Sequence, residues 1–199
     1  MSVPVMSRRD ASIKRAIDVA GAVTLFVTLA PVMALVALSI GLTSPGPILY
    51  RQVRVGRDGY PFTVVKFRTM IPNAEAGTGP VWARRGDSRQ SAVGRLLRAT
   101  NLDELPQLFN VLRGEMSLVG PRPERPEFVQ RFRREIPGYA MRHAVLPGMT
   151  GWAQIRGWRG ATALEPRIAC DLDYIARWSV GRDLLILLAT PVLGFRNAH

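Results

Sequence analysis

An apolar stretch near the amino end constrains this chain more than any other feature. Residues 19–42 carry no charged side chain and follow a basic, polar segment that contains Lys14 and Arg15. As one helix, this stretch would extend about 36 Å, which is enough to cross a bilayer. A secretory signal peptide is the first alternative, but its apolar region would be shorter and would end in a small-residue cleavage site. Residues 43–47 instead read Thr-Ser-Pro-Gly-Pro.

Two features of the stretch favour a helix that enters the membrane, bends and returns. Pro31 lies in its middle, where it removes a backbone hydrogen bond and favours a sharp bend. Basic residues flank both ends, with Arg51, Arg54 and Arg57 on the carboxyl side, so the positive-inside rule places both ends in the cytoplasm. A re-entrant helix satisfies both conditions. A proline-kinked single span is the alternative that the sequence leaves open.

Composition narrows the chemistry that this chain can perform. The formal net charge of +12 favours polyanionic partners such as nucleic acid, anionic lipid or nucleotide phosphates. The single cysteine, Cys170, excludes a disulfide within this sequence and a Cys-rich zinc site, and fits a reducing compartment. His143 and His199 are the only histidines, which excludes multi-His metal centres and His-paired nucleophiles. Carboxylates and arginines must therefore carry any chemistry.

The middle of the sequence predicts a β-hairpin followed by a loop. Residues 48–55 and 62–67 are rich in β-formers and flank Arg57-Asp58-Gly59, which is typical of a hairpin turn. Residues 71–90 contain several prolines and glycines with little periodicity and predict a loop over a site. A helical pattern resumes near Ser91.

The carboxyl-terminal third predicts helices at a membrane surface. Ile168, Leu172 and Ile175 recur at helical spacing, with Asp171 and Asp173 off that stripe, which predicts an amphipathic helix. Residues 184–195 are apolar but too few to span, and they suit the membrane interface. This region also contains three tryptophans, Trp152, Trp158 and Trp178. They can anchor the protein at the membrane interface, or they can be buried in its core. We therefore expect a helix-dominated α+β fold, with an N-terminal re-entrant membrane helix, a small β-hairpin, and amphipathic interfacial helices around a compact cytoplasmic catalytic domain.

The segment LDELPQ at residues 102–107 holds the first candidate for chemistry. Proline is tolerated in a helix's first turn, so Pro106 predicts a helix that begins around Asn101 to Asp103 and runs towards Gly114. One explanation is structural, because acids complement a helix's amino end and Asn101 with Glu104 resembles a capping box. The functional explanation is that Asp103 and Glu104 stay ionised beside free N–H groups and act as a nucleophile or as ligands for Mg²⁺.

Arg122, the second candidate, stands between Pro121 and Pro123. The two prolines stiffen the backbone on both sides, so the guanidinium is aimed and suits a phosphate clamp, although a surface turn would have the same pattern. Glycine-punctuated segments at 147–154 and 157–160 carry polar groups that can contact a nucleotide or a sugar.

Taken together, these segments resemble the bacterial sugar transferase family, the monotopic phosphoglycosyl transferases. The resemblance covers nearly the whole chain, and the ordered set of motifs is highly specific. The landmarks run in this order: Lys14, Arg15 and Asp18 before the apolar run; Ser44-Pro45-Gly46-Pro47; Gln52, Arg54, Gly56 and Gly59; Lys66-Phe67-Arg68-Thr69-Met70; Asp87 and Arg89; Leu102-Asp103-Glu104-Leu105-Pro106-Gln107; Gly120-Pro121-Arg122-Pro123; and Pro147-Gly148 with Thr150-Gly151.

The resemblance implies a two-step transfer. Asp103 would attack the β-phosphate of a UDP-sugar, release UMP and carry the phosphosugar to polyprenyl (undecaprenyl) phosphate, with Glu104 assisting. Mg²⁺ would bind at Asp103 and Glu104. The residues that the resemblance assigns to substrate phosphates are Lys66, Arg98, Arg122 and Arg159.

The resemblance also implies a place in the cell. One domain over residues 1–199 would comprise a membrane re-entrant helix at about 14–46, bent at Pro31, and a cytoplasmic catalytic portion at 47–199. The enzyme would be monotopic in the bacterial inner membrane and would initiate lipid-linked exopolysaccharide, O-antigen or glycoprotein glycan synthesis, with a possible homodimer. Asn101 stands where serine is frequent in the family and is expected to cap the helix equally well. The motif at 157–160 resembles members that transfer a hexose-1-phosphate.

A non-enzymatic alternative is a basic, membrane-tethered nucleic-acid-binding or scaffold protein. The charge of +12 favours it, but no nucleic-acid-binding module is recognisable and the basic residues are dispersed among glycine and proline motifs. We therefore expect no nucleic-acid partner. A polytopic type of transferase would need many membrane spans, whereas this sequence has one candidate.

Overall fold

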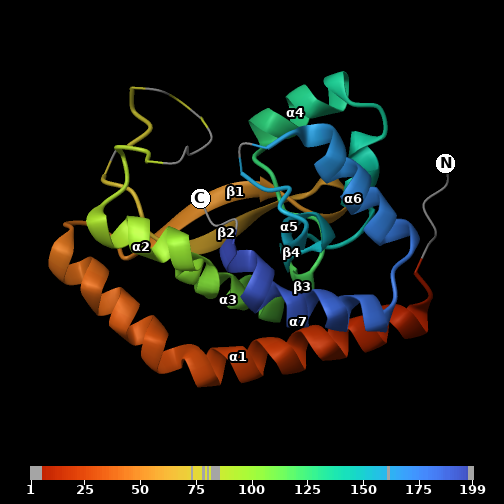
Figure 1. The fold of residues 1–199 in the computed structure, drawn as a ribbon, viewed down its shortest axis with the longest axis horizontal. Helices are drawn as coiled ribbons and strands as arrows, with labels where there is room; N and C mark the ends of the chain where they lie inside the picture. Colours follow the sequence, from red (N-terminus) through yellow and green to blue (C-terminus); the bar gives the residue numbers. More distant parts are fainter. Residues whose placement is uncertain are drawn as a thin grey trace.

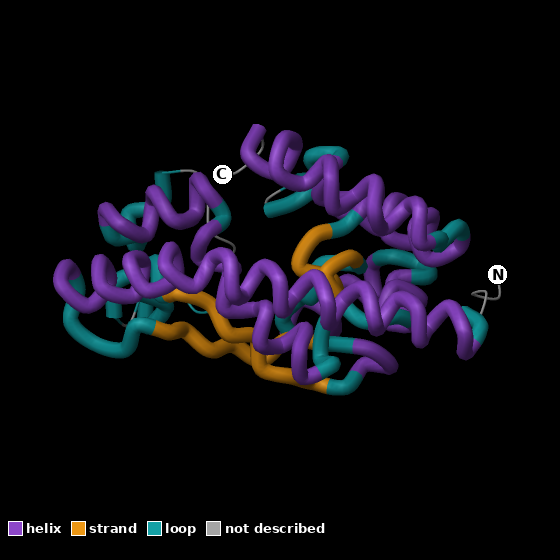
Figure 2. The backbone as a smooth tube through the Cα atoms, turned by 90° about the horizontal axis from the view of Figure 1, so that it is seen from below, coloured by secondary structure: helices purple, strands orange, loops and turns teal. Residues whose placement is uncertain are grey.

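Helices dominate the fold, as the sequence predicts for a helix-rich α+β chain. The computed structural model describes residues 6–72, 74–77, 79, 81, 86–160 and 162–196. One long helix, α1 (Arg8–Thr43), lies along one side of the molecule, and only some of the other elements contact it directly (Figures 1 and 2). They follow in this order: β1 (Leu49–Val55), η1 (Arg57–Gly59), β2 (Pro61–Phe67), α2 (Ala92–Thr100), η2 (Leu102–Gln107), α3 (Leu108–Arg113), β3 (Ser117–Val119), α4 (Pro126–Glu135), η3 (Tyr139–Ala144), β4 (Gly148–Thr150), α5 (Trp152–Ile155), α6 (Leu164–Ala176) and α7 (Val180–Arg196).

Helix α1 is continuous through Pro31, and its axis bends in Figure 1. Ser7 caps its amino end by accepting a hydrogen bond from the Asp10 N–H at 3.1 Å, so the helix begins earlier than the apolar run predicts. By length and composition, α1 is the one helix in the described part of the chain that could cross a membrane. It exposes many large apolar side chains, among them Val23, Leu25, Val27, Leu35, Leu38 and Leu42.

The predicted β-hairpin is confirmed. Strands β1 and β2 pair antiparallel, with Tyr50 opposite Lys66 and Val55 opposite Pro61. Asp58 makes the reversal in the left-handed region, with φ 55°. Because successive side chains of a strand alternate between faces, Tyr50, Gln52 and Arg54 share the face that carries Lys66. One face of the hairpin therefore collects polar groups from both strands.

The amino end of α1 is tied to the rest of the fold by buried polar contacts. Lys14 Nζ donates to Asp183 at 2.7 Å and to the Val119 carbonyl at 3.0 Å. The Tyr174 hydroxyl donates to the other oxygen of Asp183 at 2.6 Å. One turn further along α1, Asp18 accepts hydrogen bonds from β3. These contacts join α1, α6 and α7 around β3, which pairs in parallel with β4.

Asn110 of α3 holds the hairpin against the helical layer. Its side chain is fully buried; Oδ1 accepts from the Val65 N–H at 3.1 Å and Nδ2 donates to the Thr63 carbonyl at 2.7 Å. The amide thus pairs with the free edge of β2 as a neighbouring strand would. This contact fixes the position of Lys66 on β2 relative to the helix that follows Asn101.

The two carboxyl-terminal helices are confirmed, with one difference. Ile168 and Ile175 of α6 are buried, as their helical spacing predicts. Asp171 does not belong to that apolar stripe, yet it is also buried and pairs with Arg142 at 2.6 Å. Helix α7 begins four residues before the predicted apolar segment. It buries Ile186 and exposes Leu184, Leu185, Leu188 and Val192, which is the pattern of a helix with one uncovered apolar face.

Asp183 is expected to contribute strongly to stability. Asp183→Asn would leave the buried Lys14 ammonium without the carboxylate that bonds it, which costs about 3–5 kcal/mol. Thermal or denaturant unfolding of the purified protein in detergent would measure the loss. Asp173→Asn is the control, because Asp173 is 35% exposed where it pairs with Arg182, and a surface pair contributes about 1 kcal/mol or less. Equal losses in the two variants would contradict the prediction.

Candidate active site

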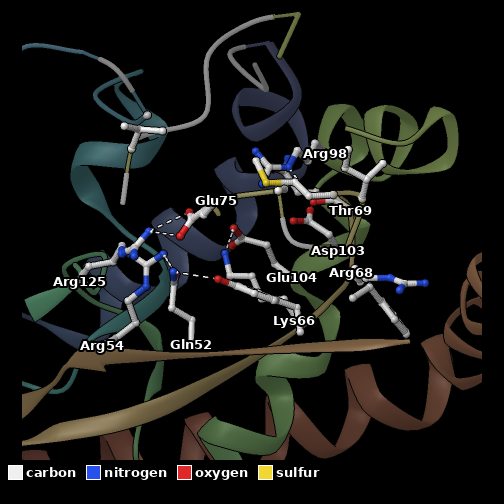
Figure 3. Close-up of a pocket in the computed structure, with 18 of the residues that line it drawn as sticks. Gln52, Arg54, Lys66, Arg68, Thr69, Glu75, Arg98, Asp103, Glu104 and Arg125 are labelled. Carbon is white, nitrogen blue, oxygen red and sulfur yellow. Dashed lines mark hydrogen bonds and ion pairs between the residues drawn. The ribbon is translucent and has the colours of Figure 1, made fainter. Parts of the chain in front are cut away.

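A cavity of about 630 Å³ lies between the polar face of the hairpin, η2 and the segment that leads into α4. The side chains that point into it come from parts of the chain that are far apart in sequence (Figure 3). The charged residues on its wall are Arg54, Lys66, Arg68, Glu75, Arg98, Asp103, Glu104, Arg122, Glu124, Arg125 and Arg167. Cations outnumber carboxylates among them, so the cavity suits an anionic ligand.

The backbone around Asn101 differs from the expected capping box. Asn101 ends α2 in the left-handed region, with φ 55°, a conformation that asparagine tolerates better than most residues. Its side chain makes no capping hydrogen bond to the following turn; instead its Oδ1 accepts from Arg159 Nη1 at 3.4 Å. The next residues form a 3₁₀ helix through Pro106, and the α-helix begins only at Leu108. The capping-box explanation is therefore wrong, whereas Asp103 and Glu104 do lie in the first turn of a helix, the 3₁₀ helix η2.

Glu104 is held by two cations. Lys66 Nζ donates to Oε1 at 2.7 Å, and Arg122 Nη1 donates to Oε2 at 3.0 Å, with its Nη2 bonded to Oε1 as well. Burial opposes the charged form of Glu104, but Arg122 and Lys66 outweigh that effect and keep its pKa well below the ordinary value. Glu104 thus stays ionised and fixes both cations at the cavity wall.

Asp103 lies next to this cluster in a different electrostatic setting. It is 7% exposed, and no described residue donates a hydrogen bond to its carboxylate. Burial and then the charge of Glu104 raise the pKa of Asp103 to about 6, against the opposing effect of Lys66 and Arg98. At neutral pH the carboxylate is mostly ionised yet poorly solvated. A desolvated carboxylate that faces a cationic cavity can act as a nucleophile.

Three of the four predicted phosphate-binding residues lie on the cavity wall. Lys66 and Arg122 flank Glu104, and Arg98 donates from Nε to Thr69 Oγ1 at 2.8 Å beside Asp103. Arg159 is not part of the wall and contacts Asn101 at its margin. The structure therefore brings Lys66, Arg98 and Arg122 together around the Asp-Glu pair. Arg159 lies at the cavity margin, close enough that Arg122 lowers its pKa in addition to burial, and its phosphate-binding role stays a prediction.

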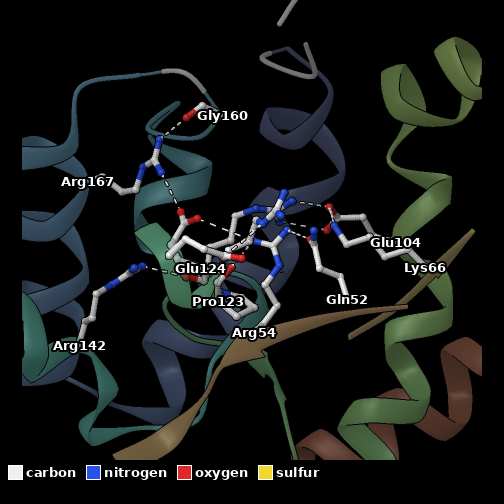
Figure 4. Close-up of polar contacts among 12 residues, drawn as sticks. Gln52, Arg54, Lys66, Glu104, Pro123, Glu124, Arg142, Gly160 and Arg167 are labelled. Carbon is white, nitrogen blue, oxygen red and sulfur yellow. Dashed lines mark hydrogen bonds and ion pairs between the residues drawn. The ribbon is translucent and has the colours of Figure 1, made fainter. Parts of the chain in front are cut away.

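A buried polar network, partly in the cavity wall and partly behind it, holds the segment that carries Arg122 (Figure 4). Arg142 Nη2 donates to the Arg122 carbonyl at 2.9 Å and pairs with Asp171. Glu124 pairs with Arg167 at 3.1 Å and lies 3.7 Å from Arg54. Arg122 is thus aimed by tertiary contacts as well as by its prolines. No pattern in the sequence indicated a role for Arg142, Glu124 or Arg167. Arg54 was noted only as a flanking basic residue and a family landmark, and the strand alternation of Tyr50, Gln52 and Arg54 could have placed these side chains on one face.

The donor atoms of the cavity fit a magnesium ion held through one protein carboxylate. The described residues contain no group of three or more acidic, histidine or cysteine side chains that could enclose a metal. Mg²⁺ commonly needs only one or two carboxylates, because waters and substrate phosphates complete its shell. The Asp103 carboxylate is free to serve, whereas the oxygens of Glu104 bond Lys66 and Arg122. Of the two predicted ligands, Asp103 fits the role directly.

Comparison with known proteins agrees with this site. The profile of the bacterial sugar transferase family matches residues 9–197, and the chain belongs to that family. It is 51% identical, over 89% of its length, to a UDP-glucose:undecaprenyl-phosphate glucose-1-phosphate transferase of Caulobacter vibrioides, of which it covers 67%. An Escherichia coli K12 protein of the same description is 46% identical, over 93% of this chain and 40% of its own length. A UDP-N-acetylgalactosamine-undecaprenyl-phosphate N-acetylgalactosaminephosphotransferase of Aeromonas hydrophila is 45% identical, over 90% and 43% respectively. The chain thus spans between two fifths and two thirds of these relatives.

The raised pKa of Asp103 predicts a measurable coupling to Glu104. The folded protein holds a proton on Asp103 up to about pH 6, whereas the unfolded chain loses it near the ordinary value. The contribution of this group to stability therefore falls as pH rises through that window. Glu104→Gln removes the neighbouring charge and releases both cations, so the pKa of Asp103 should fall towards its ordinary value.

A ¹³C NMR titration of aspartate-labelled protein would measure this shift, with Asp103→Asn assigning the signal. Glu127→Gln is the control, because Glu127 is 54% exposed and lies outside the cavity wall. An Asp103 pKa that rises or stays unchanged in Glu104→Gln would contradict the coupling.

Proposed function

We propose that this protein is a phosphoglycosyl transferase that moves a sugar-1-phosphate from a UDP-sugar to undecaprenyl phosphate and releases UMP. One observation carries the proposal: the Asp103 carboxylate, buried and without a hydrogen bond from any described residue, faces a cavity lined by Lys66, Arg98 and Arg122. The activities named for the Caulobacter and Escherichia relatives support it.

Asp103 is the nucleophile in the proposed mechanism. A lone pair of its carboxylate forms a bond to the β-phosphorus of the donor, and the bond from that phosphorus to the bridging oxygen breaks. The electron pair remains on that oxygen, which leaves as part of UMP. In the second step an oxygen of the polyprenyl phosphate attacks the same phosphorus, and the electron pair of the Asp103 bond returns to the carboxylate. The covalent intermediate divides one difficult transfer into two steps.

The cations of the cavity stabilise both steps. Donor and acceptor are polyanions that repel each other and the nucleophile, and preorganised cations offset that repulsion without reorganising during the reaction. Glu104 contributes by holding Lys66 and Arg122 in place rather than by attacking. Mg²⁺ bound through Asp103 and the donor phosphates would add Lewis-acid stabilisation of the charge on the transferred phosphoryl group.

We also propose that α1 is a re-entrant helix and that the catalytic cavity faces the cytoplasm from the inner membrane. The exposed apolar residues of α1 and α7, together with a lipid acceptor, support a membrane location. The sugar is proposed to be a hexose, in line with the glucose named for two relatives. The product would initiate a lipid-linked glycan.

Asp103 should carry a trappable phosphosugar. With a UDP-sugar and Mg²⁺ but no polyprenyl phosphate, the protein should release about one equivalent of UMP per site in a burst and gain one phosphosugar, seen by mass spectrometry. Asp103→Asn should lower both by at least about a thousandfold, because an amide is a far poorer nucleophile. Asp58→Asn is the matched control, since Asp58 is exposed and asparagine also tolerates its left-handed backbone. If UMP is released only when the acceptor is present and no adduct forms, the covalent mechanism is wrong and the lipid phosphate attacks the donor directly.

The re-entrant path of α1 predicts that both of its ends are cytoplasmic. Cysteines introduced at Ser7 and Ser44, with Cys170 replaced, should be protected from a membrane-impermeant thiol reagent in intact cells. Both should react after lysis. Labelling of one position but not the other in intact cells would establish a true span and rule out re-entry.

A further inference from the structure

The cavity extends beyond the cations that hold Glu104 to a further guanidinium, that of Arg54 (Figures 3 and 4). Arg54 lies four residues along β1 from Tyr50, the partner of Lys66, and on the same face. Its Nη2 donates to Gln52 Oε1 at 2.6 Å and its Nη1 donates to the Pro123 carbonyl at 3.2 Å. In Figure 3, Lys66 and Glu104 lie between Asp103 and Arg54, and Arg122 bonds Glu104.

The positive charge of Arg54 is only partly compensated. Both of its hydrogen-bond partners are neutral, and the nearest carboxylate, Glu124, is 3.7 Å away and bonds Arg167 at 3.1 Å. Burial lowers the pKa of Arg54, and repulsion from Arg122 and Arg125 adds to that effect against the attraction of Glu124 and Glu104. Arg125, by contrast, is paired with both oxygens of Glu75. An anion beside Arg54 would relieve this local excess of positive charge.

In-line phosphoryl transfer determines where such an anion belongs. Attacking and leaving oxygens lie on opposite sides of the phosphorus, so with Asp103 on one side and the transferred phosphoryl group at Lys66 and Arg122, UMP leaves on the side of Arg54. In the second step the Asp103 oxygen is the leaving group. The acceptor phosphate must then attack from the side that UMP vacated.

We infer that Arg54, oriented by Gln52, forms a subsite for a phosphate monoester that is occupied in turn by the phosphate of UMP and by the phosphate of the polyprenyl acceptor. This inference rests on the proposed covalent mechanism. In the first step the bridging oxygen takes the electron pair and the UMP phosphate becomes a dianion, which the guanidinium stabilises. In the second step the same guanidinium binds the acceptor dianion before its oxygen attacks.

Arg54→Gln, with Arg51→Gln as the matched control, tests the shared subsite. Arg51 is an exposed arginine on the opposite face of the same strand and is not part of the cavity wall. We expect Arg54→Gln to weaken UMP binding, measured by calorimetry, by about tenfold or more, which is the loss of a hydrogen bond to a charged group. UMP release without acceptor should slow by a similar factor. Protein loaded with phosphosugar to completion, freed of nucleotide and then given polyprenyl phosphate should also form product about tenfold more slowly.

Two further measurements separate the subsite from a merely structural effect. Hydrolysis of the loaded adduct by water should be unchanged, because water needs no phosphate subsite. In the unaltered protein, excess polyprenyl phosphate should inhibit the first step competitively with the UDP-sugar. If Arg54→Gln slows UMP release but not transfer to polyprenyl phosphate, Arg54 serves the donor alone. If it slows hydrolysis of the adduct as much as transfer, Arg54 only supports Arg122 through Pro123. Either result overturns the inference. Absence of UMP release from the unaltered protein without acceptor would refute the covalent mechanism itself.

Discussion

The ion pairs of Glu104 with Lys66 and Arg122 are the interaction on which the site depends. They join η2, the hairpin and the segment before α4, three parts of the chain that share no local sequence relation. A largely buried carboxylate between two cations resists displacement, because loss of either partner leaves a poorly solvated charge without its counter-charge. Both carboxylate oxygens of Glu104 already accept hydrogen bonds from these cations. Its neighbour Asp103 is thereby left as the carboxylate that faces the cavity without a bonded cation.

The apolar helix and the catalytic site are coupled through short paths in the fold. Lys14 and Asp18 of α1 form hydrogen bonds with the backbone of β3. Arg122 follows the end of β3 by three residues. At the other end of α1, Ile40 packs with Phe67 and Leu97, which lie next to Arg68 and Arg98. Both walls of the cavity therefore rest on the helix that is proposed to enter the membrane. A lipid acceptor held at that membrane would meet a site whose geometry is fixed by the same helix.

Much of the secondary structure could be predicted from local signals, and the site only in part. The turn at Arg57–Gly59 predicted the hairpin, and Ser91 marked the start of α2. Pro106 indicated the first turn of a helical segment, but the left-handed Asn101 depends on how α2 meets η2, which no local pattern encodes. The β3–β4 pair and the Arg142–Asp171 bond join residues about thirty positions apart, and an isolated arginine and aspartate give no sign of such a partner. Arg54 was noted only as a basic residue after the apolar run and as one of the family's landmarks, and neither observation places it in the cavity.

Opposite pKa shifts in two adjacent carboxylates distinguish the nucleophile of the site from its neighbour. Glu104 is stabilised as an anion and is consequently a weak nucleophile, whereas Asp103 has a pKa raised to about 6. The second ionisation of a phosphate monoester also lies near 6. The raised pKa brings Asp103 closer in basicity to the departing UMP and the incoming lipid phosphate than an ordinary aspartate would be, and basicity governs both attack and departure in phosphoryl transfer. A more basic Asp103 would attack readily but leave slowly, and a less basic one would do the reverse. Burial beside a like charge places Asp103 between these limits, so the same carboxylate can serve as nucleophile in the first step and as leaving group in the second.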